Sequence, residues 1–146
     1  MVAVAAPIRF IPKSFFLVPF LHGTNKLIQW VSASEGAKPF IDNEAEHPHI
    51  NYNKIPVKSL YELRRLIRSL KDFLPRVTVP SLILHADNDP VVASSSAGEL
   101  INMLGSNNKQ IKIINADRHG ILMNNTGGIW SIIDTFLDDI CSCVLP

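Results

Sequence analysis

The last third of this 146-residue chain alternates two short strand-like runs with two amphipathic segments. Residues 81–84 and 110–114 have the length and composition of strands. Residues 96–104 and 130–140 carry apolar side chains at helical spacing, and the first of them opens on a capping-box pattern from Ser96 to Glu99. Strands that alternate with helices are joined by crossovers and lie parallel. The sequence therefore predicts an α/β fold.

The first 75 residues show no such alternation. Residues 2–6 form an apolar run that Pro7 stops, as expected of a buried parallel strand. Residues 10–31 are apolar and aromatic but contain two prolines, which favours short helical pieces over one helix. Three prolines in residues 32–56 predict an irregular segment, and residues 60–74 are a clear amphipathic helix.

Composition excludes several classes of protein. Lys and Arg number 14 against 13 Asp and Glu, so the net charge of +1 gives no reason to expect a nucleic-acid partner. No run approaches the roughly 18 apolar residues that a spanning helix needs. The two cysteines, Cys141 and Cys143, are too close to join distant segments, which predicts a reducing, cytoplasmic location.

Acidic and histidine side chains follow both predicted strands of the last third. Asp87 and Asp89 come after the first strand, and His119 comes after the second. The carboxyl ends of neighbouring parallel strands meet at one edge of a sheet, where reactive groups gather. An acid followed by a histidine fits the supporting pair of a nucleophile–His–acid triad. The alternative is a loop acid and a surface histidine, and Asp87 fits a turn former better than a catalytic group.

Residues 79–92, VPSLILHADNDPVV, and 118–122, RHGIL, resemble the end of an α/β-hydrolase. The similarity is to the carboxylesterase, monoglyceride lipase and lysophospholipase group. In that family a Gly often precedes the catalytic Asp by three residues, and Ala86 takes its place here. The resemblance thus implies Asp89 as the catalytic acid and His119 as the catalytic histidine.

The same resemblance implies a domain layout. Residues 1–6 correspond to a core strand of the hydrolase sheet, and residues 7–75 to an inserted helical cap. Residues 76–146 correspond to the C-terminal strands and helices that carry the Asp and His loops. The expected fold is the C-terminal portion of an α/β-hydrolase, with few parallel strands and flanking helices.

The nucleophile elbow of the family, G-x-S-x-G, is absent from the 146 residues. The nearest match centres on Ser34, but Pro39 follows too soon for the helix that an elbow feeds. The chain therefore resembles the part of a serine hydrolase that follows its serine, and we expect it to be inactive alone. The implied function is hydrolysis of carboxylic esters, with the acid and the histidine supplied here. The alternative is a non-catalytic binding or interaction module that retains the fold.

Further residues suggest substrate and partners. Phe15, Phe16 and Phe20 can line a pocket for an apolar acyl chain, form the small core of the cap, or do both. His47 and His49 lack further ligands at suitable spacing, so we expect no metal, and the reaction needs no organic cofactor.

Two expectations concern surfaces. Arginines on the helix at 60–74 can meet anionic headgroups, but a solvated face explains them as well, so membrane contact is not required. In the resembled family the strand that matches residues 2–6 has a neighbour on each side. An exposed edge of this strand predicts a homo-oligomer joined through it.

Overall fold

The computed structural model describes residues 1–11, 14–32, 36, 38–42 and 52–142, and of residues 14 and 15 only the backbone. The chain divides into two compact units. Met1–Ile11 together with Leu70–Pro146 form the sheet unit, and Pro12–Ser69 form the helical unit. The helical unit lies within the range 7–75 that the resemblance assigns to a cap.

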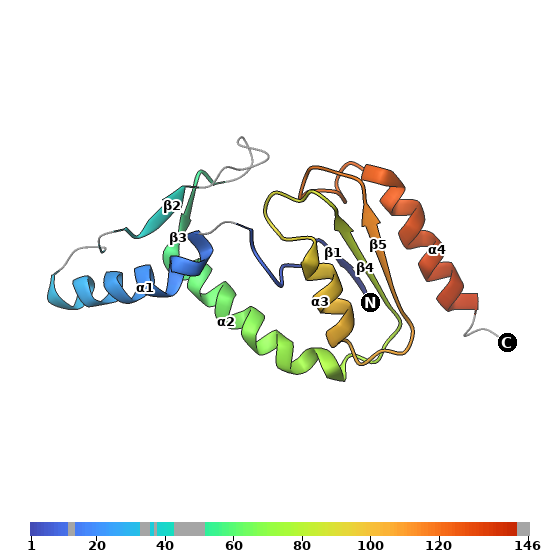
Figure 1. The fold of residues 1–146 in the computed structure, drawn as a ribbon, viewed down its shortest axis with the longest axis horizontal. Helices are drawn as coiled ribbons and strands as arrows, with labels where there is room; N and C mark the ends of the chain where they lie inside the picture. The colour runs from blue at the N-terminus through green and yellow to red at the C-terminus, as the bar shows by residue number, and fades with distance from the viewer. Residues whose placement is uncertain (12–13, 33–35, 37, 43–51, 143–146) are drawn as a thin grey trace. The chain divides into compact units, whose positions relative to one another are not determined.

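The sheet unit is built on three parallel strands (Figure 1). β1 (Val2–Val4) pairs with β4 (Ser81–Ala86), which pairs in turn with β5 (Lys109–Ile114). All six residues of the central strand β4 are buried. A parallel sheet with a fully buried central strand confirms the predicted fold class.

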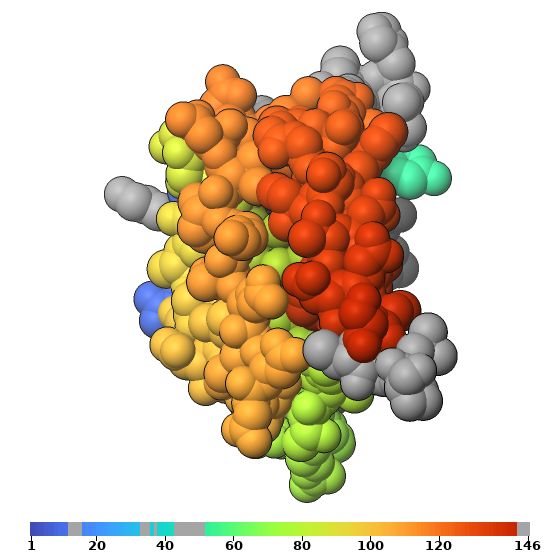
Figure 2. All heavy atoms as spheres, turned by 90° about the vertical axis from the view of Figure 1, so that its right-hand side faces the viewer, coloured from blue at the N-terminus to red at the C-terminus, as the bar shows by residue number. Residues whose placement is uncertain are grey.

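One helix covers each face of this sheet, as the alternation of side chains along β4 requires. Ile83 packs with α3 (Ser95–Met103) through Ala97 and Leu100, near the short helix η1 (Leu74–Arg76). Leu82 and Leu84 pack with α4 (Ile129–Ser142), which follows the short helix η2 (Thr126–Gly128). Figure 2 shows α4, in red, beside the segment that contains β5, in orange. The strand–helix alternation read from the sequence is therefore correct.

The capping box expected at Ser96 is wrong. Helix α3 begins at Ser95, and no side chain caps it. The buried Ser96 hydroxyl instead accepts the N–H of Arg9 at 2.9 Å and donates to the Arg9 carbonyl at 3.2 Å. Glu99 forms ion pairs with Arg9 and with Lys71. Both residues of the expected capping box therefore hold the chain segment that follows β1.

The helical unit holds α1 (Ser14–Val31), the antiparallel hairpin of β2 (Phe40–Asp42) and β3 (Lys54–Pro56), and the first part of α2 (Val57–Phe73). Our expectation of short helical pieces before residue 32 is wrong, because α1 continues through Pro19. Pro19 is the sixth residue of α1, beyond the N–H groups that lack a partner in any helix, so it removes one intrahelical hydrogen bond without ending the helix.

Large apolar side chains of α1 are exposed to solvent in the described structure. Phe16 is 68% exposed, Phe20 71% and Trp30 84%. The alternative in which Phe16 and Phe20 form the core of a cap is therefore wrong. No helix in the described part of the chain is long and apolar enough to cross a membrane.

Candidate active site

The loops after β4 and β5 are held together at the carboxyl edge of the sheet. The pairing continues past the strands, because the Asp87 N–H donates to the Ile114 carbonyl at 3.0 Å and the Asn88 N–H to the Ala116 carbonyl at 3.1 Å. The Asp87 carboxylate accepts the N–H groups of Asn88 and Ala116, each at 2.9 Å. Asp87 is thus a turn former, as expected, and it also joins the two loops.

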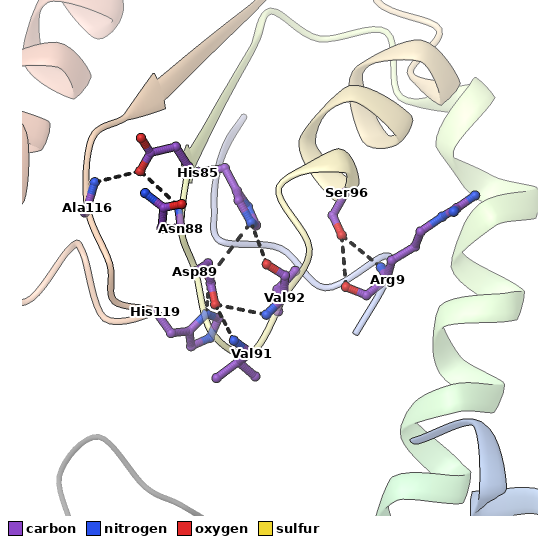
Figure 3. A network of polar contacts seen from close by, with 10 residues as sticks. Arg9, His85, Asn88, Asp89, Val91, Val92, Ser96, Ala116 and His119 are labelled. Atoms are coloured by element: carbon purple, nitrogen blue, oxygen red, sulfur yellow. Dashed lines mark hydrogen bonds and ion pairs between the residues drawn. The ribbon is translucent and has the colours of Figure 1, made fainter. Parts of the chain in front are cut away.

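Asp89 is the buried acid at this edge, with only 3% of its surface exposed. Its Oδ1 accepts the N–H of Val91 at 2.8 Å and of Val92 at 2.9 Å. Its Oδ2 lies 2.7 Å from Nδ1 of His119 (Figure 3). Backbone donors thus fix one oxygen of the carboxylate and direct the other at the imidazole.

The surroundings of Asp89 keep its carboxyl group ionised. Burial alone would raise the pKa, but the hydrogen bond to His119 and those from the Val92 and Val91 N–H groups outweigh it, so the pKa of Asp89 lies below its ordinary value. An ionised carboxylate only accepts hydrogen bonds, so Nδ1 of His119 is the donor. The lone pair of the neutral ring is therefore on Nε2. The His119 side chain is 39% exposed, so the ring is not enclosed by the protein.

The structure brings Asp89 and His119 together. Phe16 and Phe20 lie on α1 in the helical unit, and only the backbone of Phe15 is described. Ser34, His47 and His49 fall outside the described residues. Within the described ranges, no group of three His, Cys, Asp or Glu side chains could hold a metal ion.

His85 is a second histidine beside Asp89 that the sequence analysis did not connect with the site. Its ring is buried on β4, and its Nε2 lies 3.2 Å from the Val92 carbonyl and 3.8 Å from Oδ2 of Asp89. The spacing of four residues across the end of a strand was the available signal. It could not be used without knowing how sharply the loop turns back.

A parallel sheet with a helix on each face, and an acid–histidine pair at the carboxyl ends of adjacent strands, define the α/β-hydrolase class. The family model described as "Serine aminopeptidase, S33" matches residues 8–126. The chain belongs to this family of hydrolases.

Lipases are among the proteins to which this chain is similar. A thermostable monoacylglycerol lipase of Bacillus sp. (strain H-257) is 32% identical over 74 residues, which are 49% of this chain and 30% of the lipase. A structure from work on the metagenome-derived lipolytic enzymes LipS and LipT matches with a TM-score of 0.72 at 22% identity, covering 94% of this chain and 54% of that one.

Two further structures share the fold. A soluble variant of the monoglyceride lipase of Saccharomyces cerevisiae has a TM-score of 0.63 at 13% identity, over 94% of this chain and 55% of its own. The monoacylglycerol lipase of Paleococcus ferrophilus has a TM-score of 0.60 at 18% identity, over 94% and 58%. The chain thus spans 54% to 58% of the length of these structures.

Proposed function

We propose that this chain contributes the acid and the base of a serine hydrolase that cleaves carboxylic esters with an apolar acyl chain. The observation that carries the proposal is the 2.7 Å contact between Nδ1 of His119 and Oδ2 of the buried Asp89. This contact leaves Nε2 as the basic atom. A partly exposed imidazole held in this tautomer is what a general base for a serine requires.

In the proposed reaction, Nε2 of His119 takes the proton of a serine hydroxyl from outside these 146 residues. The serine oxygen bonds to the ester carbonyl carbon and a tetrahedral oxyanion forms. His119 then returns the proton to the leaving alcohol as its bond to carbon breaks. A water molecule then attacks the acyl-serine ester in the same two steps, which releases the carboxylic acid product and restores the serine. Asp89 stays ionised throughout and stabilises the imidazolium.

The apolar substrate and the domain roles belong to the same proposal. The lipase names of the relatives support an acyl ester, and the exposed Phe16 and Phe20 are available to contact an acyl chain. In this proposal the helical unit is a cap, and the sheet unit is the C-terminal part of the hydrolase sheet. The enzyme acts in the cytoplasm.

A chimera tests the proposal directly. Residues 81–142 replace the equivalent segment of the Bacillus lipase, which keeps its own serine. We expect hydrolysis of p-nitrophenyl butyrate that falls by about a thousandfold or more in His119→Gln and in Asp89→Asn. Asp117→Asn is the matched control, because this exposed acid lies two residues from His119 and is not a partner in the hydrogen bonds and ion pairs described for the pair.

Activity that survives His119→Gln in a folded chimera would contradict the assigned base. A folded chimera without turnover would favour the non-catalytic module instead. The chain by itself should show no turnover above background, because a His–Asp pair has no nucleophile or oxyanion hole of its own.

A further inference from the structure

The loop that presents Asp89 is held on two sides. On one side Val91, Val92 and Ala93 lie against residues 9–11 of the chain. The Ile11 N–H donates to the Val91 carbonyl at 3.1 Å, and the Ala93 N–H donates to the Arg9 carbonyl at 2.9 Å. On the other side, side chains of the site contact Val92.

Two side chains hold Val92 from that second side. Asp89 Oδ1 accepts the Val92 N–H at 2.9 Å, and Nε2 of His85 lies 3.2 Å from the Val92 carbonyl (Figure 3). A carbonyl oxygen only accepts hydrogen bonds, so the proton of the His85 ring is on Nε2. His85 therefore fixes the peptide group between Val92 and Ala93, which directly follows the Val92 N–H that Asp89 accepts.

His85 also faces the carboxylate itself. Its Nε2 lies 3.8 Å from Oδ2 of Asp89, the oxygen that accepts from His119. This distance is too long for a hydrogen bond, but the ring N–H dipole acts at close range where neither side chain reaches solvent, since His85 is 1% exposed. Two imidazoles thus lie next to one carboxylate oxygen, one bonded to it and one beside it.

We propose that His85 is a positioning residue of the active site: its Nε2–H holds the Val92 carbonyl and thereby keeps Oδ2 of Asp89 directed at His119. It touches neither the substrate nor the reacting atoms. The proposal rests on the proposed function for its relevance to catalysis. The structural effect on the Asp89–His119 contact is independent of the proposed function.

The test compares two replacements of similar volume in the intact chain. The amide nitrogen of Gln takes the place of Nε2 in His85→Gln and can still donate to Val92, whereas His85→Met fills the space without a donor. The measurement is the exchange rate with water of the His119 Nδ1 proton, followed by NMR in ¹⁵N-labelled protein.

We expect exchange to be about tenfold faster in His85→Met and within about twofold of the native rate in His85→Gln. Tenfold corresponds to about 1.4 kcal/mol, the net size of one hydrogen bond. An unchanged rate in folded His85→Met would overturn the proposal. Equal acceleration in both variants would do the same, because it would assign the effect to the shape of the ring and not to its donor.

In the active chimera, His85→Met should lower kcat and leave KM unchanged, since His85 does not contact the substrate. A higher KM with an unchanged kcat would contradict the proposed role. A chimera with no activity would refute the proposed function and leave the exchange experiment as it stands.

Discussion

Truncating Asp89 should destabilise the sheet unit by an amount that its hydrogen bonds determine. Asp89→Ala leaves the Val91 and Val92 N–H groups and Nδ1 of His119 without their acceptor. The Val92 donor is buried, whereas the donor on the partly exposed His119 ring can be solvated again. A buried donor without a partner costs about 1–3 kcal/mol and the partly buried Val91 donor about 1 kcal/mol, so we expect the alanine variant to lose about 2–4 kcal/mol in all.

Asp89→Asn should cost much less. The amide oxygen can replace Oδ1 and accept the same two backbone N–H groups, so only the charge assistance of these bonds is lost. Hydrogen bonds to a charged group are roughly twice as strong as neutral ones, which predicts a loss of about 1–2 kcal/mol. The exposed Asp117 serves as the control, and Asp117→Ala should stay within about 0.5 kcal/mol of the native chain.

Urea unfolding followed by the fluorescence of Trp130 measures these differences. The indole N–H of Trp130 donates to the Leu122 carbonyl at 2.9 Å on the sheet unit, so its emission reports that unit. Trp30→Phe removes the other indole, which is 84% exposed. A loss below about 1 kcal/mol in Asp89→Ala, or equal losses for Ala and Asn, would refute the reasoning from unsatisfied donors.

Three further predictions concern the sheet unit. Because the pKa of Asp89 is lowered on folding, its carboxylate contributes stability above the ordinary pKa of 3.8, and this contribution is lost as the pH falls through the folded-state pKa. The urea midpoint should therefore fall less steeply with acidification in Asp89→Asn than in the native chain. Thermal unfolding should show that Gly105→Ala destabilises the chain by about 1–3 kcal/mol, since the new Cβ would lie 2.0 Å from the Pro75 carbonyl oxygen. In the same assay Gly98→Ala in α3, whose new Cβ meets nothing within 4 Å, should stabilise the chain by about 0.5–1 kcal/mol. Among the described residues, strand β1 has a partner on one side only, so sedimentation at micromolar concentration should show a dimer or larger species. A stable monomer would contradict this prediction.

Sequence periodicity predicted those strands and helices in which buried side chains recur at regular spacing. The apolar run of β4 and the helical spacing of α4 depend on neighbours in the same element, so a short window of sequence suffices. The closeness of Asp89 and His119 followed from a rule on strand ends, combined with the family resemblance. Their assignment as acid and base remains a prediction.

Contacts between distant segments could not be predicted in this way. Ser96 matched a local capping pattern, yet its partner is the backbone of Arg9, which is 87 residues away in sequence. The proximity of His85 to Asp89 depends on a turn in the loop and not on periodicity. The helix through Pro19 was missed for a different, local reason, since the propensity against proline was outweighed by the rest of α1.

The protonation of the His119 ring is the most direct measure of whether Asp89 prepares this residue as a base. Long-range ¹H–¹⁵N correlation spectra of ¹⁵N-histidine protein distinguish the two ring nitrogens, at a pH where the ring is neutral. We predict a proton on Nδ1 and none on Nε2 in the native chain. In Asp89→Asn, whose amide can donate to Nδ1, the proton should move to Nε2. A native ring protonated on Nε2, or a ring that Asp89→Asn leaves unchanged, would contradict the account.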